Sequence, residues 1–280
     1  MNGAPFDALM LALFCLALIS ATGVLSELRP FQIVGQGARQ CLQLLREGNR
    51  LPLYAFVFLT FQELAPSFIA AHGVQLWTAI GIVILVKSLS VYALAHVAYR
   101  LHRGLIYKEW VKGLSWGRQE RRMALYVLLG WSLVTLAGNF PMPAAFHRGP
   151  TSDLLAGVMI SISVFILKTF LALIGPAASL GDPKPLRRSI SSVVREPAGI
   201  FSLVALIRLM LELLRQAFGL ATGALAGFEI GQWLIMLASQ GAMMFLFVLS
   251  EFAVVIALTR TWEDHYEDET RHAAHNLDWL

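Results

Sequence analysis

Charged side chains are scarce in this chain. Asp, Glu, Lys and Arg make up 14% of its 280 residues, whereas hydrophobic residues make up 57%. A soluble domain of ordinary composition carries about 25% charged residues. A surface that needs so little charge faces mostly lipid, so the composition excludes an ordinary soluble protein and indicates an integral membrane protein.

Cysteine is almost absent as well. The two cysteines are Cys15, inside an apolar run, and Cys41, in a predicted loop. Because they are expected at different depths, we predict no disulfide between them, and no closely spaced cysteine pair exists to bind a metal.

The sequence also lacks the motifs of known catalytic sites. It contains no phosphate-binding loop, dinucleotide fingerprint, zincin motif or nucleophile elbow. Neither His72 nor His96 has a carboxylate and a nucleophile at a recognisable spacing. We therefore predict no catalytic residue and no cofactor.

Long apolar runs dominate what is present. A transmembrane helix needs about 20 predominantly apolar residues. The runs that meet this requirement are 8–26, 52–71, 75–98, 123–142, 154–176, 198–220 and 231–258. They predict an all-α, polytopic transmembrane helix bundle with about seven spans. Residues 1–280 would form a single membrane domain, with an extra first span in 1–27 and an acidic, histidine-containing tail in 259–280.

The alternative interpretation of the first run, residues 8–26, is a cleaved secretory signal peptide. Such peptides begin with a positively charged segment. Residues 1–5 contain no Lys or Arg, and Asp7 is acidic. We therefore expect the run to be retained as the first transmembrane helix.

Basic residues lie almost entirely on one side of this predicted topology. The connections 27–51, 99–122 and 177–197, together with the tail, hold 17 of the 22 Lys and Arg residues, and the opposite side holds only Arg148. Cytoplasmic loops are enriched in Lys and Arg. The asymmetry predicts that the N-terminus is outside and the C-terminus is in the cytoplasm. Because membrane orientation already explains the cations in these short loops, we predict no nucleic-acid partner.

Three basic connections carry an amphipathic pattern. Segments 32–46, 105–122 and 184–195 each place apolar residues at helical spacing beside cations. Such helices can lie among the lipid head groups, with anionic lipid as their partner. We predict three cytoplasmic elbow helices; the alternative is that they pack on neighbouring loops. The residues expected at the head groups are Arg103, Lys108, Trp110, Lys112, Trp116, Arg187 and Arg188.

Several charges lie inside the predicted spans. Charges in the membrane interior are costly, so they are expected to pair or to face the bundle interior. The depth of each charged residue in the membrane, counted along its helix from the helix end, predicts three pairs. Arg215 is expected to extend its side chain to the outer membrane surface. The pairs are Glu63 with Lys87, Arg208 with Glu212, and Lys168 with Glu251. They are interpreted either as structural pairs that fix helix register or as parts of a proton or ion path.

The tail contains one candidate metal site. If residues 261–280 are helical, His265, Glu269 and His272 share one face. Imidazole and carboxylate groups bind transition metals. The alternative interpretation, which we favour, is a solvated acidic tail.

Two stretches carry a resemblance to a known family. Residues 96–130 contain His102, Arg103 and Glu109 ahead of a basic segment, and residues 166–207 contain Pro176-Ala177 ahead of a basic amphipathic helix. Over residues 32–260 the chain resembles a family of proteobacterial multi-pass membrane proteins, similar in pattern to the membrane domain attached to some glycerophosphodiester phosphodiesterases. The resemblance implies six core helices and an inner-membrane location, and it supplies no catalytic residue.

These observations lead to three hypotheses about function. The first is a non-enzymatic membrane scaffold or accessory subunit that would organise lipids and contact other membrane subunits. The second is a small-solute or ion transporter or channel that uses the buried charges. The third, suggested only by the phosphodiesterase resemblance, is an enzyme that acts on lipid head groups.

Overall fold

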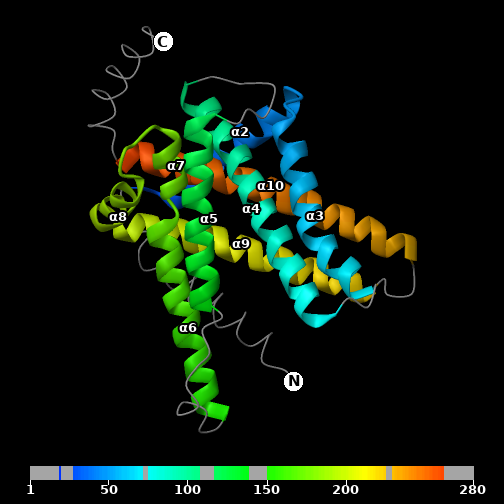
Figure 1. Cartoon of the computed structure of the whole chain (residues 1–280). Helices are drawn as coiled ribbons and strands as arrows, with labels where there is room; N and C mark the ends of the chain where they lie inside the picture. Colours follow the sequence, from blue (N-terminus) through cyan, green and yellow to red (C-terminus); the bar gives the residue numbers. More distant parts are fainter. Residues whose placement is uncertain are drawn as a thin grey trace.

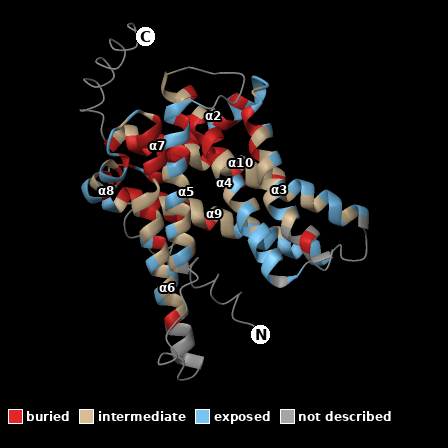
Figure 2. Ribbon diagram, viewed as in Figure 1, coloured by how far each residue is buried: buried red, intermediate tan, exposed pale blue. Residues whose placement is uncertain are grey.

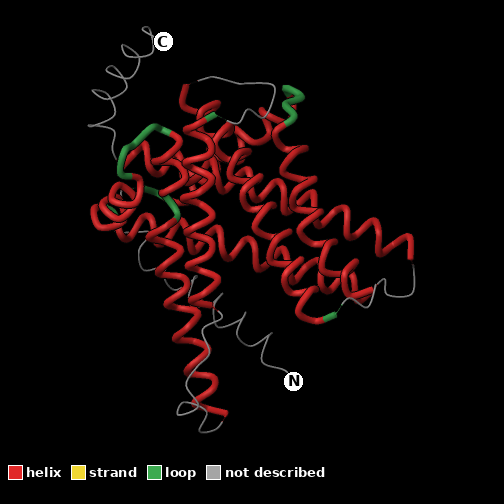
Figure 3. Tube along the Cα trace, in the orientation of Figure 1, coloured by secondary structure: helices red, strands yellow, loops and turns green. Residues whose placement is uncertain are grey.

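The computed structural model describes Ile19 and residues 28–71, 75–107, 117–138, 150–224 and 229–261. Within these ranges every regular element is an α-helix, and no strand occurs (Figures 1 and 3). The prediction of an all-α protein is confirmed for this part of the chain. The predicted first span and the tail from 262 onward lie outside the described residues, apart from Ile19.

The described helices follow one another with short connections. They are α2 (Pro30–Arg46), α3 (Leu51–Ala71), α4 (Leu76–Tyr107), α5 (Arg118–Gly138), α6 (Pro150–Leu171), α7 (Ile174–Ser179), α8 (Pro185–Arg195), α9 (Pro197–Ala224) and α10 (Glu229–Thr261). Four of them begin at a proline, which lacks an N–H group and is therefore well tolerated in a first helical turn. Gly48 and Gly181, which follow α2 and α7, have positive φ angles that reverse the chain.

Four described helical segments are long and apolar enough to cross a bilayer. They are Trp77–Tyr107, Ala156–Ser179, Pro197–Ala224 and Ile230–Thr261. The predicted spans 52–71 and 123–142 are not among these four segments. Only Leu51–Ala65 of α3 counts as a shorter apolar helix, and α5 spends its first five residues on Arg118-Gln119-Glu120-Arg121-Arg122.

One predicted elbow is not a separate helix where it is described. Residues 105–107 form the end of α4, and residues 118–122 form the beginning of α5, while 108–116 lie outside the described residues. The predicted end of the span at 98 was too early, because no proline interrupts the helix there. The Arg103 guanidinium lies over the rings of Tyr99 and Tyr107, one turn away on either side. These cation–π contacts favour helical continuation through Tyr107.

The other two predicted elbows are short helices close to the expected bounds. Residues 32–46 lie in α2 and residues 184–195 correspond to α8. Each helix buries one face against the bundle: Ile33, Gly37, Cys41 and Leu44 on α2, and Pro185, Ser189, Ser192 and Val193 on α8. The Ser189 hydroxyl also donates a hydrogen bond to the Phe170 carbonyl. Both helices are therefore anchored to the bundle as well as amphipathic.

Burial is concentrated at one end of the molecule. Buried residues gather around α2, α7 and α8 and the part of α10 beside them, whereas the start of α10 and the halves of α3 and α4 nearest their connection are largely exposed (Figure 2). We call the end that holds α2, α7 and α8 the elbow end. Its core includes Ile33, Leu173, Ile200, Leu203 and Leu258, which come from three different helices and the connection before α7.

One close helix crossing at the elbow end is at Gly37. A Cβ atom added there would lie 3.2 Å from the Leu249 carbonyl oxygen and 3.5 Å from the Ala253 nitrogen of α10. Both neighbours are backbone atoms, which cannot rotate away. Glycine is thus required for α2 to lie this close to α10.

We predict that Gly37→Leu lowers the stability of the purified protein by about 1–3 kcal/mol, the usual cost of overpacking. Gly35→Leu is the matched control, because nothing lies within 4 Å of a Cβ added at Gly35. Thermal unfolding in detergent measures both variants. Equal melting temperatures for the two variants would show that the α2–α10 crossing is not tight.

Candidate functional site

A polar chain of three residues lies inside the elbow end. His102 of α4 is fully buried, and its Nε2 lies 2.8 Å from Oε2 of Glu251 on α10. Its Nδ1 lies 3.1 Å from Oγ of Ser179, the last residue of α7. The Ser179 hydroxyl donates to the Pro176 carbonyl oxygen at 2.7 Å. Three helices that are distant in sequence therefore meet at one imidazole.

The bonding pattern uses both nitrogens of the imidazole. Nε2 faces the Glu251 carboxylate, and Nδ1 faces the Ser179 hydroxyl. Which atom donates in each contact depends on the tautomer of His102. The Glu251 carboxylate is therefore bonded to His102 rather than to Lys168.

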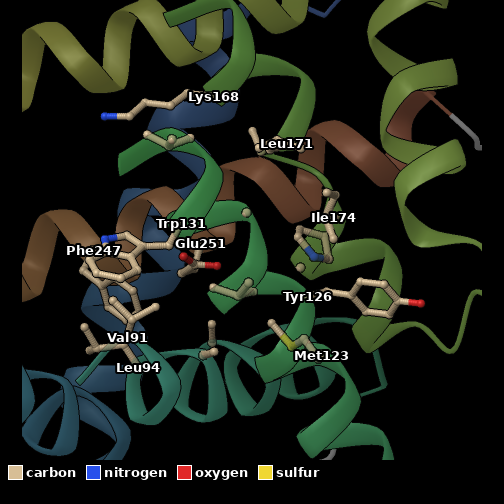
Figure 4. A pocket seen from close by; sticks show the side chains of 18 residues that line it. Val91, Leu94, Met123, Tyr126, Trp131, Lys168, Leu171, Ile174, Phe247 and Glu251 are labelled. Atoms are coloured by element: carbon tan, nitrogen blue, oxygen red, sulfur yellow. The ribbon is translucent and has the colours of Figure 1, made fainter. Parts of the chain in front are cut away.

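A cavity of about 350 Å³ adjoins this pair. Its walls come from α4, α5, α6, α7 and α10, and they are mainly apolar and aromatic, including Trp131, Tyr126 and Phe247. Figure 4 shows the Glu251 carboxylate among these side chains and the Lys168 side chain at the margin of the group. Small-molecule sites have volumes of about 300–1,000 Å³ and combine apolar walls with a few polar groups. The cavity meets that description.

Lys168 is the cationic residue of the cavity wall. The sequence predicts that it pairs with Glu251, but in the structure Glu251 bonds His102. None of the carboxylates in the described residues lies within ion-pair distance of Lys168. The charges that act on it are those of Arg208 and Arg215 from α9, both positive. A lysine at the centre of a transmembrane helix costs about 2.5–3.5 kcal/mol on insertion scales.

The predicted Glu63–Lys87 pair is not formed. Glu63 is exposed on α3, and no ion pair within the described residues joins it to Lys87. The depth count was misleading because α4 ends at Tyr107 rather than at 98. Measured from the ends of α3 and α4 that adjoin their connection, Glu63 lies about 12 Å and Lys87 about 16 Å into its helix at 1.5 Å per residue.

Glu212, predicted to pair with Arg208, makes a contact with another residue of α9. Oε1 of Glu212 accepts a hydrogen bond from Nε2 of Gln216 at 3.0 Å, one turn further along α9. Glutamate and glutamine four residues apart are neighbours on a helix surface, so this contact competes with the predicted one. Arg208 remains on α9 as a half-buried residue.

The arginines of the elbow end divide into two kinds. Arg100 forms an ion pair with the buried Glu120, whose Oε2 also accepts the Gly117 N–H at 2.6 Å and so caps α5. Arg188 forms an ion pair with Asp182 at 2.6 Å. These are internal bonds, and they change the role predicted for Arg188. Arg187 is exposed, as predicted for a head-group contact.

Other predicted site residues cannot be placed. Lys108, Trp110, Lys112 and Trp116 lie outside the described residues, as do His265, Glu269 and His272 of the tail. In the part of the chain that the structure describes, no cluster of His, Cys, Asp and Glu is arranged to hold a metal ion. Cys41 is fully buried, and burial raises the pKa of its thiol to about 11, so it is protonated at neutral pH and unsuited to nucleophilic chemistry.

Sequence reasoning missed the partner of Glu251. His102 entered the sequence analysis only through the family resemblance, and Ser179 was not considered. A usable signal was present, because His102 follows Leu94 and Ala98 at helical spacing on a face that is otherwise apolar. A histidine at such a position requires a polar partner from another helix.

Comparisons with known proteins add no identification: no family model matches the chain, and neither a curated protein nor a solved structure does.

The buried histidine yields a stability prediction. His102→Leu should lower the stability by about 1–3 kcal/mol, because it leaves Glu251 and Ser179 without a bond that they make in the folded protein. The double variant His102→Leu with Glu251→Met should recover part of that loss, because two apolar side chains leave no polar group unsatisfied. Thermal unfolding in detergent measures both, with the exposed Glu212→Gln as a nearly neutral control. A double variant no more stable than His102→Leu alone would contradict the pairing.

Proposed function

We propose that this chain is a non-enzymatic, multi-pass protein of the bacterial cytoplasmic membrane that holds anionic lipid at its cytoplasmic face and serves as a lipid-organising scaffold or accessory subunit. The proposal depends most on α8. It places three large apolar side chains at the surface in one row: Leu186 is 47% exposed, Ile190 41% and Val194 68%.

The row on α8 is bordered by cations. Arg187 and Lys184 are exposed beside it, while the opposite face of the helix is buried. An exposed apolar row next to cations would be a liability in water, but it matches the chemistry of the lipid head-group region. The helix could bury the row in the outer part of the acyl-chain layer while its cations meet anionic head groups.

α2 repeats the arrangement. Phe31, Leu42 and Leu45 are exposed on a face different from the one that packs on α10, and Arg39 and Arg46 are exposed nearby. Because α2 and α8 both belong to the elbow end (Figure 1), one membrane surface can accommodate both. Two such helices acting together give stronger membrane attachment than one.

The proposed topology has seven spans, with the N-terminus outside and the C-terminus inside. Exposed apolar rows support membrane contact for α3 and α5, which are not among the four segments long and apolar enough to cross a bilayer. The rows are Leu53, Val57, Phe61 and Leu64 on α3, and Leu125, Leu129, Leu133 and Leu136 on α5. Each row has the spacing of one helix face. The one-sided distribution of Lys and Arg supports the orientation.

The family resemblance enters the same proposal. A relationship with the membrane domain attached to some glycerophosphodiester phosphodiesterases would suit an accessory role, because it carries over no catalytic residue. An enzyme acting on lipid head groups is therefore less well supported than a protein that binds them.

A second candidate function is transport of a small solute or ion. The observation in its favour is the cavity, which holds a lysine and a carboxylate among apolar walls. Charges that face a cavity inside a membrane bundle are typical of transport pathways. The internal repeats that many transporters share were not evident in the sequence.

The topology can be tested by cysteine accessibility in a Cys15→Ser, Cys41→Ala background. A cysteine replacing Arg148 should react with a membrane-impermeant maleimide in intact cells. Cysteines replacing Arg118 or Arg187 should react only after the membrane is permeabilised. Reaction at 118 in intact cells would overturn the proposed orientation.

The lipid interaction can be tested by replacing two cations on α8. Lys184→Gln with Arg187→Gln should weaken the retention of phosphatidylglycerol by about 2 kcal/mol, or roughly thirtyfold, at about 1 kcal/mol per charge. Native mass spectrometry measures the retention. Arg215→Gln, which removes an exposed cation from α9, serves as the control and should have little effect. Equal retention by all three proteins would refute lipid binding through α8.

A further inference from the structure

We propose that the cavity at the elbow end is a binding site for an amphiphilic monoanion, a molecule with an acyl chain and one carboxylate or phosphate head group, with Lys168 as the residue that meets the head group. This site is distinct from the surface of α8, and the inference goes beyond the proposed attachment of the protein to the membrane surface.

The walls of the cavity select an apolar ligand body. Leu94, Val127 and Leu171 line it together with aromatic residues. Its volume of about 350 Å³ lies at the lower end of the range found for small-ligand sites. A ligand with only polar surface would make no favourable apolar contact with these walls.

The charge of the cavity selects an anionic head group. The Glu251 carboxylate lies 2.8 Å from Nε2 of His102, so it already has a bonding partner within the protein. Lys168 is the basic residue of the lining. A monoanion would neutralise it, whereas a cation would meet repulsion.

The surroundings of Lys168 favour the same ligand class. The described residues supply no carboxylate at ion-pair distance from it, while Arg208 and Arg215 add positive potential from α9. A cation buried among cations and apolar side chains is stabilised by a counterion. An acyl anion supplies the counterion and the apolar surface in one molecule, and a membrane protein meets such molecules at high concentration.

The test uses the purified full-length protein in a non-ionic detergent, with the fluorescent polyene fatty acid cis-parinaric acid as the probe. Palmitate, phosphatidylglycerol and methyl palmitate are the competitors. We expect palmitate or phosphatidylglycerol to displace the probe, and whichever competes better identifies the source of the acyl anion. Methyl palmitate, which lacks the charge, should compete at least about tenfold more weakly than palmitate, a difference of 1.4 kcal/mol.

Variants assign the binding to the cavity. Lys168→Met should weaken probe binding at least about tenfold and leave the affinity for methyl palmitate unchanged, while Lys168→Arg should keep most of the affinity. Gly130→Leu should also weaken binding, because Gly130 lines the cavity and a Cβ added there would lie 3.7 Å from Leu171 Cδ1.

The outcomes separate this site from the surface of α8. Lys184→Gln with Arg187→Gln should not change probe binding, even though it is expected to reduce phosphatidylglycerol retention. The inference is overturned if Lys168→Met and Gly130→Leu fold and bind the probe like the wild type, or if methyl palmitate competes as well as palmitate. Should Lys168→Met fail to fold, Lys168→Arg and Gly130→Leu still decide the question.

Discussion

The contact between α2 and α10 is the constraint on which the elbow end depends. Gly37 brings α2 against the backbone of α10 at Leu249 and Ala253, and the fully buried Phe252 lies in the same interface. α10 then contacts α3, α4, α7, α8 and α9 as well. Because its position is set on one side by α2, its other side can present Glu251 to His102. A shift of α10 by even a fraction of an ångström would lengthen a hydrogen bond that tolerates little change.

The helices themselves were largely predictable, because the signals that define them lie within each sequence segment. Pro185 begins α8 where the sequence places it, and the apolar spacing of residues 32–46 identifies α2 to within two residues. Local signals could not predict where α4 ends, because the tyrosine–arginine contacts that extend it compete with an equally plausible amphipathic break. The number of helices that cross the membrane remains a prediction where residues are not described.

The charge pairs were not predictable from the sequence, for a geometric reason. Depth along a helix gives one coordinate, whereas a bond between helices also depends on which way each face points. Glu251 was expected near Lys168 by depth, and both residues do line the same cavity, but the face of α10 that carries Glu251 also meets His102 of α4. Glu63 illustrates the same limit, because it was expected to face the bundle interior but is exposed on α3. Rotation about the helix axis is the missing information.

The uneven burial of the molecule has a mechanical consequence. The elbow end is a packed block, whereas the far halves of α3 and α4 and the start of α10 present large apolar side chains outward, Trp77, Leu85 and Trp233 among them. In the proposed membrane placement, the thickness of the leaflet around these halves would influence their tilt. The two leaflets would then act on this protein unequally, because one would surround a packed block and the other would surround helices with large exposed apolar faces.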